Sequence, residues 1–251
     1  MMPVDESDEQ DSMAAKGAGR PEANMIAGGE PSRARRMQGD ALACFDRWAE
    51  EYDRSFLSRH IRAVQKRVVR TMRPPEDAFV LDVGCGTGEG IRYLARWVKR
   101  GFLAGLDLSP QMIEVARRKL PDQSRMDLKV GDAEQLPWPD SFFDQVMSTF
   151  TLHHIPRPDR ALTEIQRVLK PGGRLFLVDL IFPKPLWRPL NWLLMLAERA
   201  ELQVQTSESL SRLFLQAPFH TFSTRRLVPL IFLWVGQKKL PAAKEKGTEI
   251  A

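Results

Sequence analysis

The sequence predicts an α/β fold built on a doubly wound, mostly parallel sheet of seven strands. Between residues 79 and 181, short apolar runs alternate with segments whose apolar residues recur at helical spacing. This alternation is typical of strands joined by crossover helices, an arrangement that produces a parallel sheet. After it, residues 218–224 and 230–235 have the pattern of an antiparallel pair that closes the sheet.

Composition divides the chain into a folded domain at residues 40–239 and two tails. Residues 1–39 are rich in Asp, Glu, Gly, Ser and Pro, and their few apolar residues show no period, so we expect disorder there. We expect the same of residues 240–251. Within the domain, cap helices are predicted at residues 40–76 and a lid insertion, rich in Trp and Leu, at residues 182–205.

The parallel strands are predicted from apolar runs, and the turns and helices between them from local signals. Ser109 and Pro110 start a helix as its N-cap and first-turn proline. A helix at residues 159–169 leads through the turn at residues 171–173 into the last parallel strand. The five predicted parallel strands are, in chain order, residues 79–83, 102–106, 126–130, 142–148 and 175–181.

The turn after the first predicted strand carries glycine at every second position, at Gly84, Gly86 and Gly88. Glycine allows positive φ angles and lets a ligand approach where a Cβ would collide. The spacing differs from the dinucleotide motif G-x-G-x-x-G, because Glu89 stands at the sixth position. Asp82, two residues before the first glycine, suits a cationic ligand group better than a pyrophosphate.

Four segments in order resemble the motifs of class I S-adenosylmethionine-dependent methyltransferases. The likeness extends over residues 42–180 and is greatest to the small-molecule branch that includes the ubiquinone/menaquinone C-methyltransferases. The matching segments are VLDVGCGTGEGI at residues 80–91, LDLSP at 106–110, GDAEQLP at 131–137 and RVLKPGGRL at 167–175.

The resemblance implies that S-adenosylmethionine is the cofactor, and it implies how the first strand and the cap helices bind it. Gly84, Gly86 and Gly88 would admit the methionyl part, with Asp82 near its amino group. The segment FDRWAEEYD at residues 45–53 is similar to the one that lies over the cofactor in this family. Tyr52 is therefore a candidate contact to cofactor or substrate; the alternative is an aromatic packing residue.

The resemblance also implies roles for residues at the ends of the second and third strands. Asp107 would accept hydrogen bonds from both ribose hydroxyls, and Leu108 would pack on the adenine. Asp132 would accept from the adenine amino group, and Ala133 would flank the ring. No metal ligand is implied.

Candidates for a catalytic base follow the fourth predicted strand, where substrate should lie. His153 and His154 stand there, and histidine titrates near neutral pH. The alternative is that the pair has a local structural role. Asp179 and His220 are further candidates, and an amine acceptor needs no base beyond water.

The second cap helix separates apolar and basic residues onto opposite sides. Its basic side is a solvated face, or it contacts anionic lipid head groups, or it binds nucleic acid. The apolar side holds Leu57, Ile61, Val64, Val68 and Met72, and the basic side holds Arg59, Arg62, Lys66, Arg70 and Arg73.

These features predict an enzyme that methylates a hydrophobic small molecule, such as a quinol, a phenolic metabolite or a lipid. The alternatives are a phospholipid N-methyltransferase at a membrane surface and a non-catalytic S-adenosylmethionine-binding partner protein. Nucleic acid is disfavoured as substrate, because residues 148–151 lack the motif that grips a flipped base. No apolar run is long enough to span a membrane and no signal peptide is evident, so we expect a cytoplasmic protein, peripheral to the inner face of a membrane at most. The sequence leaves the oligomeric state and the acceptor atom open.

Overall fold

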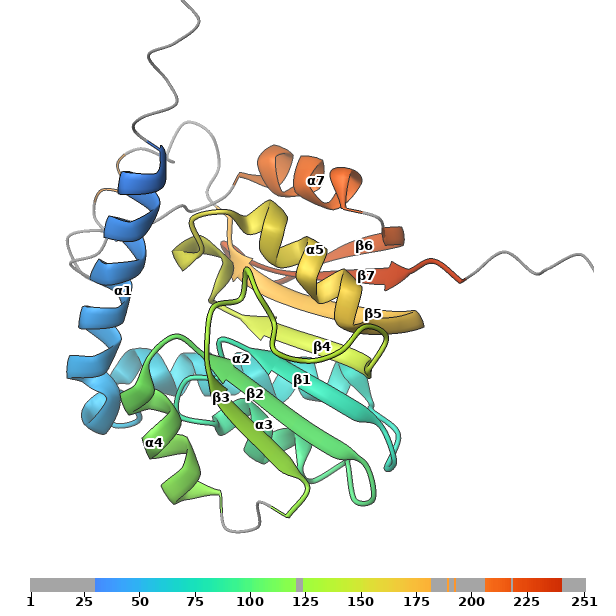
Figure 1. Ribbon diagram of the computed structural model, residues 1–251, viewed down its shortest axis with the longest axis horizontal. Coiled ribbons are helices and arrows are strands. Elements are labelled where there is room, and N and C mark those ends of the chain that lie inside the picture. Colours follow the sequence, from blue (N-terminus) through green and yellow to red (C-terminus); the bar gives the residue numbers. More distant parts are fainter. Residues whose placement is uncertain are drawn as a thin grey trace, which may run out of the picture.

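The computed structural model describes residues 30–120, 124–181, 189, 192, 206–217 and 219–240. Within these residues, seven strands form one sheet in the order β3-β2-β1-β4-β5-β7-β6 (Figure 1). Strand β7 pairs antiparallel with both β5 and β6, and the other strand pairs are parallel. The predicted fold class, with its closing antiparallel pair, is confirmed. The strands are β1 (Phe79–Val83), β2 (Phe102–Asp107), β3 (Met126–Val130), β4 (Phe143–Thr149), β5 (Leu169–Leu180), β6 (Phe219–Val228) and β7 (Ile231–Lys238).

Helices cover both faces of the sheet, and each face has its own apolar core. On one face α5 and α7 pack against a core that includes Leu81, Val146 and Leu177. On the other face α2, α3 and α4 pack against a core that includes Val80 and Met147. The central strands are buried on both sides, which is why they read as continuous apolar runs rather than as alternating patterns. The helices are α1 (Glu30–Tyr52), α2 (Phe56–Met72), α3 (Glu89–Leu94), α4 (Pro110–Lys119), the 3-10 turn η1 (Leu152–His154), α5 (Pro158–Val168) and α7 (Ser207–Gln216).

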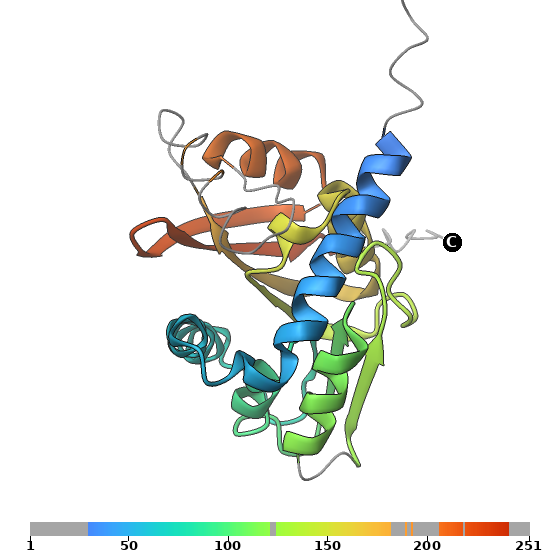
Figure 2. The ribbon, with the colours of Figure 1, turned by 90° about the vertical axis from the view of Figure 1, so that its left-hand side faces the viewer.

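The long helix α1 belongs to neither face. It lies along the edge of the sheet at which the parallel strands end (Figure 1), and Figure 2 shows it crossing in front of that edge. The carboxyl ends of parallel strands are where doubly wound sheets bind ligands. Helix α1 therefore covers the sheet edge at which a ligand-binding site is expected.

Local capping explains where several helices begin. The Ser109 hydroxyl accepts a hydrogen bond from the Met112 N–H at 3.1 Å, with Pro110 as the first helical residue, as predicted. Ser55 caps α2 by accepting from the Ser58 N–H. These caps satisfy N–H groups that no helical carbonyl can reach.

Two boundaries differ from the prediction. Helix α1 begins at Glu30, ahead of the domain boundary predicted at residue 40, because buried Met37 adds a packing contact that a sequence period does not reveal. Strand β5 begins at Leu169 and runs through the predicted turn at residues 171–173. The turn persists as an irregularity in the strand, with Gly172 at φ +78°, because a bulge accommodates extra residues without ending the pairing.

Three predicted segments lie outside the described residues. They are the tail up to residue 29, the tail from residue 241, and the lid insertion at residues 182–205 apart from Pro189 and Trp192. Among the described residues, no helix is both long enough and apolar enough to cross a membrane.

Candidate active site

The carboxyl ends of β1 to β4 border one cavity beneath α1. It encloses about 880 Å³ of empty space, part of it open to solvent. Asp82, Gly86 and Gly88 are not part of its wall. The predicted cofactor residues that do line the wall are Tyr52, Gly84, Asp107, Leu108, Asp132 and Ala133.

The three glycines of the loop after β1 all have positive φ angles, and their surroundings differ. A Cβ at Gly84 would lie 2.0 Å from the Thr151 Oγ1, and one at Gly88 would lie 3.1 Å from the Ala116 Cβ of α4. A Cβ at Gly86 would meet no atom within 4 Å. Gly84 and Gly88 therefore allow close packing, and Gly86 leaves open space beside the loop.

The carboxylate of Asp107, at the end of β2, holds the glycine loop in place. It accepts hydrogen bonds from the Gly86 N–H at 2.8 Å and from the Ser109 N–H at 3.0 Å. Burial raises the pKa of Asp107 although both hydrogen bonds lower it. The Asp107 side chain lines the cavity, so a hydroxyl of a ligand can add a hydrogen bond to a carboxylate that is already oriented.

The carboxylate of Asp82, at the end of β1, is fully buried and has no hydrogen-bond partner among the described residues. Burial, and then the charge of Asp107, raises the pKa of Asp82 well above its ordinary value. A Cβ at Gly90 would lie 2.3 Å from the Asp82 Oδ2, so glycine is needed there. A buried carboxylate without partners is stabilised when a cation approaches. Asp82 therefore suits the cationic ligand group that the sequence predicted. Because Asp82 does not line the cavity, it would act on that group through its charge rather than by direct contact.

Asp132 and Ala133, after β3, lie together on the cavity wall. Asp132 accepts from the Glu134 N–H at 2.9 Å and from the Gln38 Nε2 at 2.6 Å. Gln38 comes from α1 and also lines the cavity. Sequence reasoning missed Gln38, because it placed this residue in a disordered tail.

Helix α1 covers the cavity with Leu42, Phe45 and Tyr52 and is tied to the strand edge by polar contacts. The Ser109 hydroxyl donates to the Asp46 carboxylate at 2.5 Å, which joins α1 to the start of α4. Tyr52 stands at the last position of α1, where the predicted cofactor or substrate contact is within reach. The structure brings Tyr52 to the cavity wall, beside Phe45 of the same helix.

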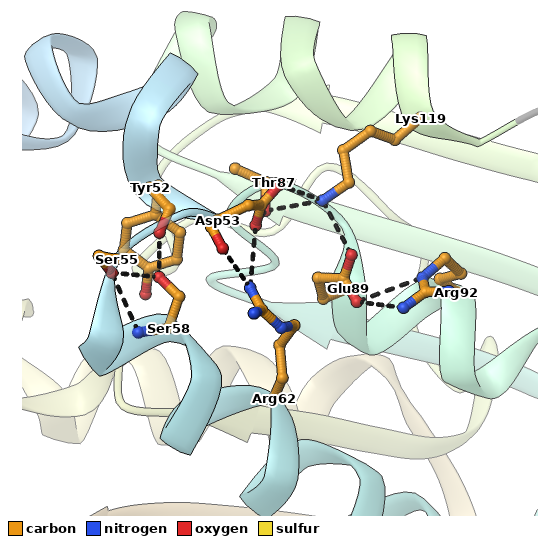
Figure 3. A network of polar contacts seen from close by, with 9 residues as sticks. All are labelled: Tyr52, Asp53, Ser55, Ser58, Arg62, Thr87, Glu89, Arg92 and Lys119. Carbon is orange, nitrogen blue, oxygen red and sulfur yellow. Dashed lines mark hydrogen bonds and ion pairs between the residues drawn. The ribbon is translucent and has the colours of Figure 1, made fainter.

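A network of charged side chains fastens the α1–α2 corner to the glycine loop (Figure 3). The Asp53 carboxylate accepts from the Thr87 Oγ1 at 2.8 Å and from the Lys119 Nζ at 2.6 Å. Lys119 also pairs with Glu89 at 3.1 Å, and Arg62 donates to the Asp53 carbonyl oxygen at 2.7 Å. Arg62, predicted to lie on the basic side of α2, is thus engaged with the site.

The two histidines after β4 have different surroundings. His153 is buried, its Nδ1 lies 2.5 Å from the Asp179 Oδ1, and it is not part of the cavity wall. His154 lines the cavity, with its ring edge-on to Phe45 at 4.9 Å between centroids. Burial, and then the proximity of His153, lowers the pKa of His154 well below its ordinary value. The side chain of His220 lies outside the described residues.

Comparison with known proteins identifies relatives of this site and fold. A family model for a methyltransferase domain matches residues 81–177. A demethylmenaquinone methyltransferase of Lactiplantibacillus plantarum is 36% identical over 168 residues, which cover 62% of this chain and 70% of the relative. A fatty-acid O-methyltransferase of Mycolicibacterium smegmatis is 42% identical over 104 residues, which cover 41% of this chain and 38% of the relative.

A solved structure extends the likeness to the fold. A SAM-dependent methyltransferase of Thermotoga maritima shares 25% identity and superposes with a TM-score of 0.62, covering 79% of this chain and all of the other. The chain therefore belongs to the class I S-adenosylmethionine-dependent methyltransferases, and S-adenosylmethionine is its cofactor.

Proposed function

We propose that this enzyme transfers the methyl group of S-adenosylmethionine to a hydrophobic small molecule, a quinol, phenolic metabolite or lipid. The proposal depends on the uneven distribution of carboxylates and apolar residues over the cavity wall. Carboxylates gather on its β2 and β3 side, and apolar residues gather near α1, α2 and the end of β4. Those apolar residues are Leu42, Phe45, Ile61, Phe150 and Ile155. The names of the two relatives, which specify a demethylated menaquinone and a fatty acid, support an apolar acceptor.

The residues that would hold the cofactor have the donor and acceptor chemistry it needs. Asp107 would accept from the ribose hydroxyls and Asp132 from the adenine amino group, with Leu108 and Ala133 beside the ring. Asp82 would balance the charge of the methionyl amino group. When bound, S-adenosylmethionine supplies a methyl group on a sulfonium, which is a good leaving group for in-line displacement. The chain's own task is to align the two ligands and exclude water.

We infer that His154 is the general base for a hydroxyl or carbon acceptor. It lies on the cavity wall, and its lowered pKa keeps the imidazole neutral, able to take a proton, at neutral pH. His153, held by Asp179, would position it, since the two rings lie 4.2 Å apart.

Replacing His154 with glutamine is expected to lower kcat by roughly 10²–10⁴-fold, the usual contribution of a general base. Affinity for S-adenosylmethionine should stay within about threefold, because His154 is not among the proposed cofactor contacts. Steady-state kinetics and calorimetry would separate the two effects. His60→Gln, an exposed change on α2, is the control. An unchanged kcat in His154→Gln would show that His153 and His154 have only a structural role.

Incubation with methyl-labelled S-adenosylmethionine tests the proposed function directly. We would offer a naphthohydroquinone, a long-chain fatty acid and phosphatidylethanolamine in parallel reactions. Label in the hydroquinone or the fatty acid is the expected result. Label in phosphatidylethanolamine alone would favour the phospholipid N-methyltransferase, and label in none of them would favour a non-catalytic binding protein.

We further propose that the α1–α2 corner rests on an anionic membrane surface when it receives its substrate. Phe56 is 72% exposed and Trp48 is 41% exposed at this corner. Exposed Arg59, Lys66 and Arg70 follow along α2. Aromatic residues beside cations are typical of surfaces that bind anionic lipid head groups.

Reversing the charges of Arg59, Lys66 and Arg70 to glutamate is expected to reduce binding to phosphatidylglycerol vesicles about a hundredfold or more, since each cation near the surface contributes about 1 kcal/mol. Flotation measures the bound fraction, which should also fall as salt is added. The matched control reverses Arg125, Arg160 and Arg174, which are exposed elsewhere on the domain. Equal binding by both triple variants would remove this proposal.

A further inference from the structure

Between α2 and the end of β4, the cavity wall contains a buried carboxamide that is only partly satisfied. The Gln65 side chain is 6% exposed, and its Nε2 donates to the Thr149 Oγ1 at 3.1 Å. The Gln65 Oε1 is buried and has no hydrogen-bond partner among the described residues. Both residues line the cavity. A buried acceptor without a partner destabilises a protein unless something supplies a hydrogen.

The position of Gln65 in the strand order separates it from the proposed cofactor contacts. In the proposed cofactor site, Asp132 and Asp107, at the ends of β3 and β2, would accept hydrogen bonds, and Asp82, near the end of β1, would balance the charge of the methionyl amino group. These strands are consecutive in the sheet, and β4 comes next on the other side of β1. Thr149 is the last residue of β4. The Gln65–Thr149 pair therefore lies beyond the methionyl end, on the side left for the methyl acceptor.

The surroundings of the pair define the chemistry that it recognises. Ile61, one turn before Gln65 on α2, and Phe150, next to Thr149, are apolar neighbours on the same wall. A primary or quaternary amine would need a carboxylate to balance its charge, and the Gln65 amide provides none. A hydroxyl is neutral, and it both donates and accepts, so it pairs with either end of an amide.

We propose that the Gln65 carboxamide, held by Thr149, receives the hydrogen bond of a hydroxyl on the methyl acceptor, as in a phenol or hydroquinone. The proposal rests on the proposed function and deepens it. Gln65 then acts as a residue that selects hydroxylated rings over ring hydrocarbons of the same size, because only a hydroxyl satisfies the buried amide.

Two probes that differ in one group test this inference without turnover. 1-Naphthol and 1-methylnaphthalene have the same ring, with a hydroxyl or a methyl group at one position. Their binding would be measured by calorimetry on protein saturated with S-adenosylhomocysteine. Gln65→Met, which keeps the side-chain length, should weaken naphthol binding about tenfold and leave methylnaphthalene binding within twofold.

The controls separate hydrogen bonding from packing and from cofactor binding. Thr149→Val should also weaken naphthol binding, because the amide loses its anchor. Gln111→Met, an exposed change on α4, should alter nothing, and Gln65→Met should keep its affinity for S-adenosylhomocysteine. Equal weakening of both probes, no weakening of naphthol, no naphthol binding by the unaltered protein, or a loss of S-adenosylhomocysteine affinity would each overturn the proposal. Failure of the proposed function has a different signature: no lipophilic acceptor is methylated, whatever the probes show.

Discussion

Replacing Asp107 with alanine is expected to weaken S-adenosylmethionine binding by about a hundredfold or more. The Asp107 carboxylate would accept two ribose hydroxyls, and hydrogen bonds to charged groups contribute about 1.5–3 kcal/mol each. The same carboxylate orders the glycine loop through the Gly86 N–H and orients the start of α4 through the Ser109 N–H. Loss of these two bonds adds to the effect, because the loop must then be ordered when the ligand binds.

Calorimetric titration with S-adenosylmethionine measures the change. Asp107→Asn keeps one acceptor oxygen but not the charge, so we expect an intermediate loss of about tenfold. Asp77→Ala, an exposed change in the turn before β1, is the control. Affinity equal to that of the unaltered protein in Asp107→Ala would contradict the cofactor assignment at β2.

The second large effect is expected at Asp82, where stability and binding should change in opposite directions. The folded-state pKa of Asp82 is raised by burial, so the folded protein holds this proton more tightly than the unfolded chain. The ionised carboxylate therefore lowers the free energy of unfolding as pH rises above the ordinary carboxyl range, and this cost is absent below it. Asp82→Asn removes the charge. We expect the ligand-free variant to be more stable at pH 7 by about 1–3 kcal/mol and to lose this advantage as pH falls toward about 4.

The same substitution should weaken S-adenosylmethionine binding at least tenfold, because the methionyl amino group loses the charge that balances it. Urea denaturation at several pH values and calorimetry would measure the two effects on one preparation. Asp77→Asn should change neither quantity. A variant that binds as tightly as the unaltered protein would show that the Asp82 charge does not serve the ligand.

Much of the parallel sheet was predictable because its signals are local. The strands β1 and β2 are mostly apolar runs with buried interiors, and β3 at the edge of the sheet is recognisable from its place in the alternation of strands and helices. Asp107 and Asp132 follow β2 and β3, and parallel strands end at one edge, so their meeting at one cavity follows from the alternation alone. The cap at Ser109 likewise depends on residues next to each other in the chain.

Other features depend on residues that are distant in sequence. Helix α1 begins at Glu30 because Met37 and Gln38 pack against the strand edge. The apolar residues among residues 30–39 have no helical spacing from which this helix could be predicted. The contact between Asp53, just after α1, and Lys119, at the end of α4, joins residues far apart in the chain, and no pattern near either of them predicts it. Gln65 is one polar residue on an apolar side of α2, and only its place against Thr149 identifies it.

The sequence by itself determined the fold class, the glycine loop and the three strand-end carboxylates. The spacing of apolar residues and the residues at strand ends depend only on neighbours in the chain. The tertiary structure alone decided which side chains are buried without a partner. Asp82 is a candidate in the sequence, and the structure adds that its carboxylate is buried without a partner among the described residues. Gln65 is an ordinary polar residue in the sequence, and it becomes a candidate for ligand recognition only because packing of α2 removes it from water.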